Sequence, residues 1–316
     1  MSLPRFVAAG TVVLAACHGG TVAHPASPTA SPSVSLAVSR SASPSASASP
    51  AASPPGSSPS AAPPSAAPPS DPFALARSTR FTGPEALADA LAQAETAIRS
   101  GTVSEAALAA AGRTQDTAYR QLVARPEWRA AVLARLPAAL RPVAEANVSA
   151  GEELEALANP RDQIPNWRIL TPRPQAELVA DYQESQRLSG APWEYLAAIN
   201  LVETRMGRIQ GLSSGGARGP MQFIPATWAY YGRGDIDNPH DAILAAGRFL
   251  AAHGAPSDMG RALYAYNPSQ HYVHAISLYA QQIRADPRAL GGYYHWQVYF
   301  RTLTKGEALL VEGYGS

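Results

Sequence analysis

From His18 to about Ser70 the sequence is almost entirely alanine, serine and proline. Such a segment has too little apolar surface to offset the entropy lost on folding, so we predict a disordered, partly polyproline-like linker over residues 18–72. A packed core can therefore come only from the rest of the chain. The patterns that predict a fold begin at residue 73.

Composition limits the partners of the folded part. The two basic residues before position 71 are Arg5 and Arg40, and the remaining 23 face 24 acidic residues, which leaves residues 71–316 at a net charge of −1. This balance gives no reason to expect nucleic-acid binding. Cys17 is the single cysteine of the sequence, so no intramolecular disulfide and no cysteine-cluster metal site can form.

Residues 1–17 have the layout of a secretory signal: a basic Arg5, an apolar run over 6–16, then small residues. The run is too short to span a bilayer comfortably. Leu14-Ala15-Ala16-Cys17 resembles a bacterial lipobox, in which the cysteine is lipidated and becomes the new N-terminus. We therefore expect Cys17 to anchor the protein on the outer face of the cell membrane, with the linker as a tether. An ordinary signal peptide is the alternative.

Residues 73–160 predict a helical module. Thr82 and Glu85 fit a capping box with Pro84 inside the first turn. Apolar residues then recur at helical spacing until Gly101. No catalytic constellation occurs here, so we interpret the module as a support or accessory part. A partner-binding role is the alternative.

A catalytic part is predicted over residues 161–290, around an apolar helix that starts after Pro192. Its apolar stripe ends at Val202 and is followed directly by Glu203. Burial raises the pKa of a carboxyl group, and a raised pKa lets glutamic acid donate a proton near neutral pH. Taken alone, Glu203 would more often be a solvated residue at a helix end.

The segment after this helix favours a catalytic role for Glu203. Residues 213–222, SSGGARGPMQ, are too rich in glycine for a helix interior, and their glycines allow close approach of a ligand to the backbone. Gln222 supplies both a donor and an acceptor, which suits a sugar amide or hydroxyl. An acid beside such a loop favours a saccharide-cleaving site.

Together these motifs resemble the bacterial lytic murein transglycosylases, goose-type-lysozyme-like enzymes that cleave peptidoglycan. The resemblance rests on Glu203, the loop 213–222, and Ala265-Tyr266-Asn267. Residues 219–225 and 235–239 are most similar to the membrane-bound MltB-like branch. The resemblance as a whole covers about residues 174–283. It implies a mainly α, lysozyme-like catalytic domain, preceded by the helical module and followed by a small hairpin.

The resemblance also implies site residues. Glu203 would be the catalytic acid, and the expected substrate contacts are Ser213, Gly219, Met221, Gln222, Tyr266 and Asn267. The family places the tyrosine near the acid, where its hydroxyl would orient Glu203 or keep it protonated. Thr204 departs from the serine that usually follows the acid but keeps a hydroxyl. The spacing of 19 positions from Glu203 to Gln222 is about one longer than in the soluble members (SLT).

We expect no metal and no organic cofactor. Residues 231–235 are too short for an EF-hand loop, so Asp235 and Asp237 are interpreted as turn and cap residues. His271 and His274 are spaced as metal ligands can be, but the sequence shows no third ligand. A surface or packing role fits them better.

Residues 291–316 carry dense aromatic and β-branched side chains around Thr304-Lys305-Gly306-Glu307, which predicts a β-hairpin. The sequence leaves open whether this extension covers the helical core or presents aromatic rings to a glycan.

Most glycosidases use two carboxylates, yet no second acid accompanies Glu203 in the motifs. This favours a lytic transglycosylase in which one glutamate acts as acid and then as base on glycan strands of peptidoglycan, in a protein expected to be a monomer. Two alternatives stay open. One is a lysozyme-type hydrolase in which Asp235, Asp237 or another acid activates water, and the other is a non-catalytic peptidoglycan-binding lipoprotein.

Overall fold

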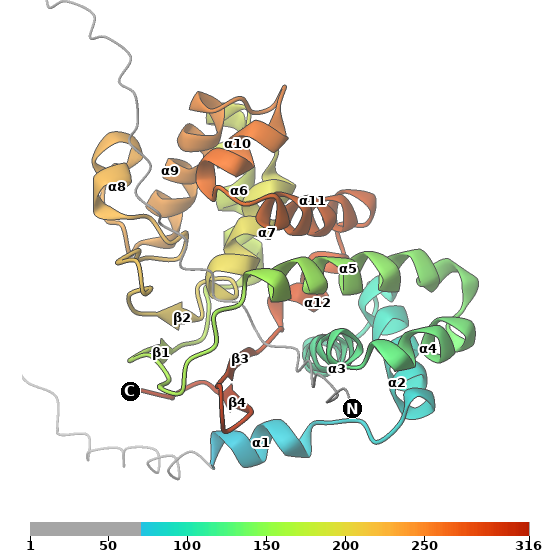
Figure 1. Ribbon diagram of the computed structural model, residues 1–316. Coiled ribbons are helices and arrows are strands. Elements are labelled where there is room, and N and C mark those ends of the chain that lie inside the picture. The colour runs from blue at the N-terminus through green and yellow to red at the C-terminus, as the bar shows by residue number, and fades with distance from the viewer. Residues whose placement is uncertain (1–70, 316) are drawn as a thin grey trace, which may run out of the picture. The chain divides into compact units, whose positions relative to one another are not determined.

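The computed structural model describes residues 71–315, and this part of the chain is mainly helical (Figure 1). Cys17, the signal segment and most of the linker lie outside the described residues. The first helices, with two short 3-10 turns between them, are α1 (Pro72–Ser78), α2 (Pro84–Ser100), α3 (Glu105–Ala124), η1 (Pro126–Trp128), α4 (Arg129–Arg135), η2 (Ala138–Leu140) and α5 (Arg141–Leu157).

The remaining elements follow a segment without helix or strand, residues 158–167, which we call the strap. They are β1 (Arg168–Ile169), α6 (Gln175–Ser189), α7 (Trp193–Thr204), β2 (Ile209–Gln210), α8 (Pro225–Tyr231), α9 (Pro239–Ala252), α10 (Met259–Tyr266), α11 (Gln270–Ala285), α12 (Ala289–Tyr294), β3 (Val298–Arg301) and β4 (Glu307–Leu310). Within residues 71–315 no helix is both long enough and apolar enough to cross a bilayer.

Local sequence explains most helix ends. Asn238 caps α9 by accepting hydrogen bonds from the amides of His240 and Asp241, and Asp258 caps α10. Gly101 ends α2 in the left-handed conformation, with φ 68°. The predicted capping box at Thr82 is wrong: Pro84 takes the first helical position, so the cap falls on Gly83, which has no side chain to accept a hydrogen bond.

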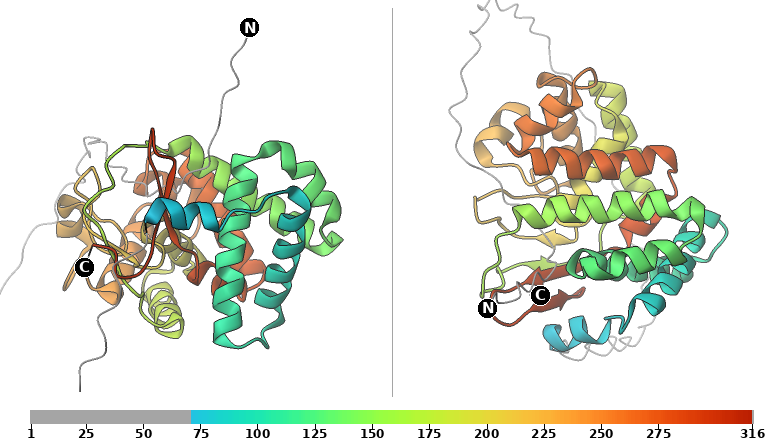
Figure 2. Two further views of the ribbon diagram at one scale, coloured as in Figure 1. Left: turned by 90° about the horizontal axis from the view of Figure 1, so that it is seen from below. Right: turned by 45° about the vertical axis from the view of Figure 1, so that its right-hand side comes forward.

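Helix α5 lies along α11, and this is the most extensive helix–helix contact of the described residues (Figures 1 and 2). Helix α11 also contacts α7, while α6 packs on α9. One apolar cluster runs through all of these helices, from Leu87 and Leu122 to Ile199, Ile243 and Ile276. The N-terminal helices and the later ones therefore share one core and belong to one compact unit.

The C-terminal hairpin is confirmed, with β3 and β4 antiparallel and Val298 opposite Leu310. It begins later than its aromatic sequence suggests, because Gly291–Tyr294 belong to helix α12. Gly292 explains the difference: a Cβ there would lie 2.6 Å from the Gln115 side chain on α3. The contact with α3 favours a compact helical turn over the strand propensity of the aromatic residues.

A second pair of short strands joins the strap to the loop that follows α7. In it β1 runs antiparallel to β2, with Ile169 opposite Ile209. The chain's last described residues lie along the other side of β1, because the Ile169 amide donates to Tyr314 and the Gly313 amide donates to Ile169. The predicted mainly α, lysozyme-like fold with a C-terminal hairpin is confirmed.

Candidate active site

Helix α7 is buried on every side, as its sequence of apolar residues predicts for a core helix. It stops sharply after Thr204, because the next two residues, Arg205 and Met206, take left-handed φ angles of 55° and 63°. Non-glycine residues rarely adopt this conformation, which must be held by surrounding contacts. Glu203 thus stands in the last turn of a helix whose end is fixed.

The Glu203 side chain is enclosed, with only 3% of the residue exposed. Its Oε1 accepts a hydrogen bond of 2.8 Å from the hydroxyl of Tyr272, the third residue of α11. Burial raises the pKa of Glu203 to about 8, and the Tyr272 hydrogen bond opposes this by favouring the charged form. Near neutral pH the group is therefore a protonated acid that can donate.

The tyrosine that donates a hydrogen bond to the acid is Tyr272, whereas the resemblance implied Tyr266 near it. The Tyr266 hydroxyl donates instead to the Met221 carbonyl, at 2.6 Å. The two tyrosine rings are nearly parallel, 4° apart in tilt, with centroids 6.4 Å apart. Tyr266 thus contacts the glycine-rich loop, while burial and the charge of Glu203 raise the pKa of Tyr272 and keep it a neutral donor.

Thr204 connects the helix end to the glycine-rich loop. Its hydroxyl donates to the Pro220 carbonyl at 2.6 Å and accepts from the Gly207 amide at 3.0 Å. The Asn200 side chain donates to the same carbonyl, at 2.9 Å. The hydroxyl that Thr204 shares with serine is therefore used for structure, fixing the loop against α7 one residue from Glu203.

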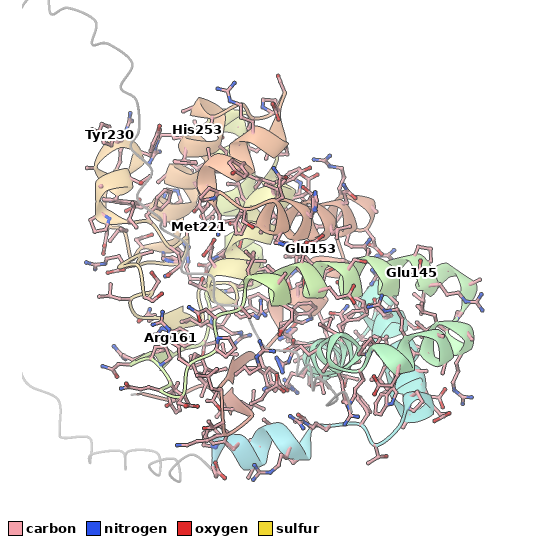
Figure 3. All side chains as sticks on the ribbon, in the orientation of Figure 1. Glu145, Glu153, Arg161, Met221, Tyr230 and His253 are labelled. Atoms are coloured by element: carbon pink, nitrogen blue, oxygen red, sulfur yellow. The ribbon has the colours of Figure 1, made fainter. Side chains whose placement is uncertain are left out.

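The segment 219–222 is a tight turn in which the Gln222 amide donates to the Gly219 carbonyl at 3.0 Å. Gln222 itself has φ 49°, and its side-chain Nε2 also donates to the Gly219 carbonyl. Met221, labelled in Figure 3, is fully buried. The turn therefore presents Gln222 from a rigid backbone beside the Pro220 contact.

Gly219 is required by this turn, and its replacement by alanine is expected to destabilise the protein strongly. Its φ is 76°, and a Cβ there would lie 2.0 Å from the Ile236 carbonyl oxygen. We expect Gly219→Ala to lower the free energy of unfolding by at least about 2 kcal/mol in urea titrations. Gly216→Ala is the matched control, because φ is 80° there and nothing lies within 4 Å of its Cβ. Equal losses in the two variants would contradict the steric argument.

The other two predicted substrate contacts lie in less direct positions. Ser213 holds its own loop together: its Oγ accepts from the Ala217 amide at 2.9 Å and from the Gly215 amide at 3.2 Å. Asn267 follows Tyr266 as the C-terminal cap of α10 and is 4% exposed. The described contacts join Glu203, Tyr272, Tyr266 and Met221 in one chain, and they do not include Ser213.

A cleft of about 600 Å³ is lined in part by Gly219 and Pro220 of the turn 219–222. The strap, the residues around β2 and the loop enclose it, and its lining includes Arg168, Gly211, Arg218, Gly219 and Gly315. Glu203 is not part of this lining, although Met206 and Gly207, which follow the end of α7, are.

The charged residues near the loop, Arg218, Asp235 and Asp237, form hydrogen bonds with one another. The Arg218 guanidinium donates to both carboxylate oxygens of Asp237, and the Asp235 carboxylate accepts from the Asp237 amide. His271 and His274 both contact Glu153 on α5. Within residues 71–315 no group of three or more His, Cys, Asp or Glu side chains is arranged to hold a metal ion.

Part of this chain is similar in sequence to a known protein. The chain is 34% identical over 131 residues to the membrane-bound lytic murein transglycosylase F of Thiobacillus denitrificans. The match covers 38% of this chain and 28% of the relative's length. No family model matches the chain, and no solved structure matches it significantly. The partial match supports a relationship to the lytic murein transglycosylases.

Proposed function

We propose that this protein is a lytic transglycosylase that cleaves the MurNAc-β-1,4-GlcNAc bond of peptidoglycan, with Glu203 acting first as acid and then as base. One observation carries the proposal: Glu203 is enclosed at the end of α7, holds a pKa of about 8 and is contacted by a neutral tyrosine donor. The partial likeness to a lytic murein transglycosylase supports the same substrate class.

In the first step protonated Glu203 donates its proton to the oxygen that joins the two sugars. The bond between that oxygen and C1 of MurNAc breaks, and GlcNAc leaves with a free 4-hydroxyl. Positive charge develops on the MurNAc ring, and the oxygen of the substrate's own acetamido group stabilises it. Glu203 is left as a carboxylate, and its hydrogen bond from Tyr272 favours that charged form.

In the second step the Glu203 carboxylate accepts the proton of the MurNAc 6-hydroxyl. The freed oxygen attacks C1 and closes a 1,6-anhydro ring, so the acetamido oxygen is released. With this proton Glu203 is again a neutral acid, ready for another turnover. No water enters the products, and one group performs both proton transfers.

The surroundings of Glu203 favour a single acid over a pair. Among the described residues, burial and the Tyr272 hydrogen bond account for the shifted pKa, and no other carboxylate contributes to it. Two carboxylates that share a site raise each other's pKa, so a catalytic partner would be expected to act on Glu203. Asp235 and Asp237, the acids considered for hydrolysis, are engaged in the turn and with Arg218.

Tyr272→Phe tests the role of the tyrosine. Loss of the hydrogen bond removes a contact that favours the charged acid, so the pKa of Glu203 rises further. The activity that depends on protonated Glu203 should then persist to higher pH, while kcat falls about 10-fold to 100-fold because the base form is less stable. Tyr266→Phe is the matched control, because its hydroxyl contacts Met221; it should leave the basic limb of the pH profile in place.

Product analysis tests the proposal itself. Purified peptidoglycan is digested with the protein, and the muropeptides are identified by mass spectrometry. Products that end in 1,6-anhydro-MurNAc support the transglycosylase. Reducing ends would assign water as the nucleophile and a lysozyme-type hydrolase. Absence of released fragments, with binding of the insoluble glycan retained, would assign a peptidoglycan-binding protein without activity.

We further propose that the protein works in the cell envelope, attached through a lipid on Cys17. The proposal rests on the lipobox-like residues 14–17 and on the membrane-bound relative. Cys17→Ala should move the protein from the membrane fraction to the soluble fraction and abolish incorporation of labelled fatty acid. A variant that stays in the membrane fraction would contradict the anchor.

A further inference from the structure

The cleft beside the end of α7 is lined by arginines from three separate parts of the chain. Arg168 belongs to β1, Arg173 precedes α6, and Arg218 belongs to the glycine-rich loop. Asp237 is the acidic residue of the same lining. The lining therefore holds more positive than negative charge, although residues 71–316 as a whole carry a net charge of −1.

Two of these arginines already have carboxylate partners within the chain. The Arg218 guanidinium donates to both carboxylate oxygens of Asp237. The Arg173 guanidinium donates to Asp181 at 2.8 Å, and to Glu177 through two hydrogen bonds of 3.0 and 2.8 Å. These two charges are thus balanced, and their guanidinium groups are held in place by acids of the protein itself.

The remaining arginine, Arg168, has no carboxylate partner among the described residues. Its backbone lies between two segments: Gln210 is opposite it on β2, and a Cβ on Gly315 would lie 3.4 Å from the Arg168 Cα. Arg168 and Gln210 are both exposed, and both line the cleft. An unbalanced guanidinium on a fixed strand is suited to bind a carboxylate, because its planar fork matches the two carboxylate oxygens.

The other polar groups of the lining that are available to a ligand are uncharged. The amides of Gly211 and Gly219 donate to no other described residue, and Gln210 adds a side-chain donor and acceptor. A polymer with a charge on every unit, such as a polyphosphate, would need several unbalanced cations. One free guanidinium among neutral hydrogen-bond groups instead fits a peptide, whose backbone pairs with amides and carbonyls and whose carboxylate pairs with arginine.

The cleft adjoins the part of the chain that carries the acid. Gly207 lines the cleft and follows Glu203 by four positions, a span of at most about 14 Å. Pro220, also in the lining, accepts the hydrogen bond of 2.6 Å from Thr204. An extended peptide of four residues covers about 14 Å as well. A peptide attached to a MurNAc bound at Glu203 is therefore long enough to reach the cleft.

We propose that the cleft binds the peptide that MurNAc carries on its lactyl group, with Arg168 pairing with a carboxylate of that peptide. This inference rests on the proposed function, because it takes MurNAc glycan as the substrate. Arg168 then makes the protein prefer strands that bear peptides over strands without them. It is a specificity residue, since it contacts the peptide and not the bond that is cleaved.

The kinetic test compares peptide-bearing glycan strands with the same strands after an amidase has removed the peptides. We expect wild type to cleave the peptide-bearing strands with about a 10-fold higher kcat/KM, mainly through a lower KM. Arg168→Gln should reduce this preference to within about 2-fold. Arg168→Lys should retain part of it, because lysine keeps the charge but lacks the planar fork.

Arg161→Gln is the matched control for these variants. Arg161 is an exposed arginine of the strap, labelled in Figure 3, and it is not part of the cleft lining. This variant should keep the wild-type preference. An active wild type without any preference, an unchanged preference in Arg168→Gln, or an equal loss in Arg161→Gln would each overturn the inference.

A binding measurement separates this inference from the proposed function. A synthetic stem tetrapeptide with free carboxylates, and its fully amidated form, are titrated into the full-length protein by calorimetry. We expect the free-acid peptide to bind at least about 10-fold more tightly, and Arg168→Gln to remove the difference. Equal binding of both peptides by wild type would overturn the inference, whether or not the protein is active. Carboxylate-dependent binding by a wild type that releases no fragments would sustain the peptide site while the proposed function fails.

Discussion

Glu203→Gln is expected to abolish the release of muropeptides from purified peptidoglycan. Glutamine keeps the shape of the side chain but can neither donate the proton to the departing sugar nor take the proton of the 6-hydroxyl. A general acid contributes about 10² to 10⁴ in rate, and here one group serves both steps. We therefore expect a loss of about 10³-fold or more in kcat, measured by chromatography of the released products.

The control for this change is Glu194→Gln, a glutamate in the first turn of the same helix. Its carboxylate pairs with Arg284 at 3.2 Å, far along α7 from the acid, so its loss should leave kcat within about 3-fold of wild type. Circular dichroism should show both variants folded. Activity retained in a folded Glu203→Gln variant would remove the basis of the assignment.

The second large expected effect is the contribution that Glu203 makes to the pH dependence of stability. Its pKa is about 8 in the folded protein and 4.5 as the ordinary value. Between these two values the folded state holds one proton more than the unfolded state, so stability falls as pH rises through the window. The contribution is fully present below about pH 4.5 and lost above about pH 8. At 1.36 kcal/mol per unit, the change is roughly 3–5 kcal/mol.

This slope can be isolated by comparison with Glu203→Gln, which has no proton to lose. Urea titrations of both proteins between pH 5 and pH 8.5 should show wild type losing stability relative to the variant by several kcal/mol. Other groups that titrate in this range act in both proteins and cancel in the difference. A constant difference across the range would show that Glu203 is not protonated in the folded state.

The place of Glu203 could be predicted from sequence because it depends on local pattern. An apolar helix, an acid directly after its last apolar residue and a glycine-rich loop together define the helix end, and the structure ends α7 at Thr204. Caps such as Asn238 and Asp258 were predictable for the same reason: a short side chain reaches an amide two or three residues away.

Tyr272 was not predictable as the partner of Glu203, because its position depends on how α11 crosses α7. Its spacing from Ile276 and Tyr279 puts it on the inward face of its helix but does not indicate where along α7 its hydroxyl lies. A tyrosine hydroxyl on an inward helix face is the available signal, since a buried tyrosine usually finds a hydrogen-bond partner. Tyr279 carries the same signal, so the sequence does not single out Tyr272.

The pairing of β1 with residues 313–314 has a practical consequence for handling the protein. Gly315 forms part of the cleft lining, and a Cβ there would lie 2.0 Å from the Trp167 carbonyl. Residues fused to the C-terminus, such as an affinity tag or a fluorescent label, would follow closely on a residue that lines the cleft. A label inserted at Gly306, in the hairpin turn where nothing lies within 4 Å of its Cβ, would avoid the lining of the cleft.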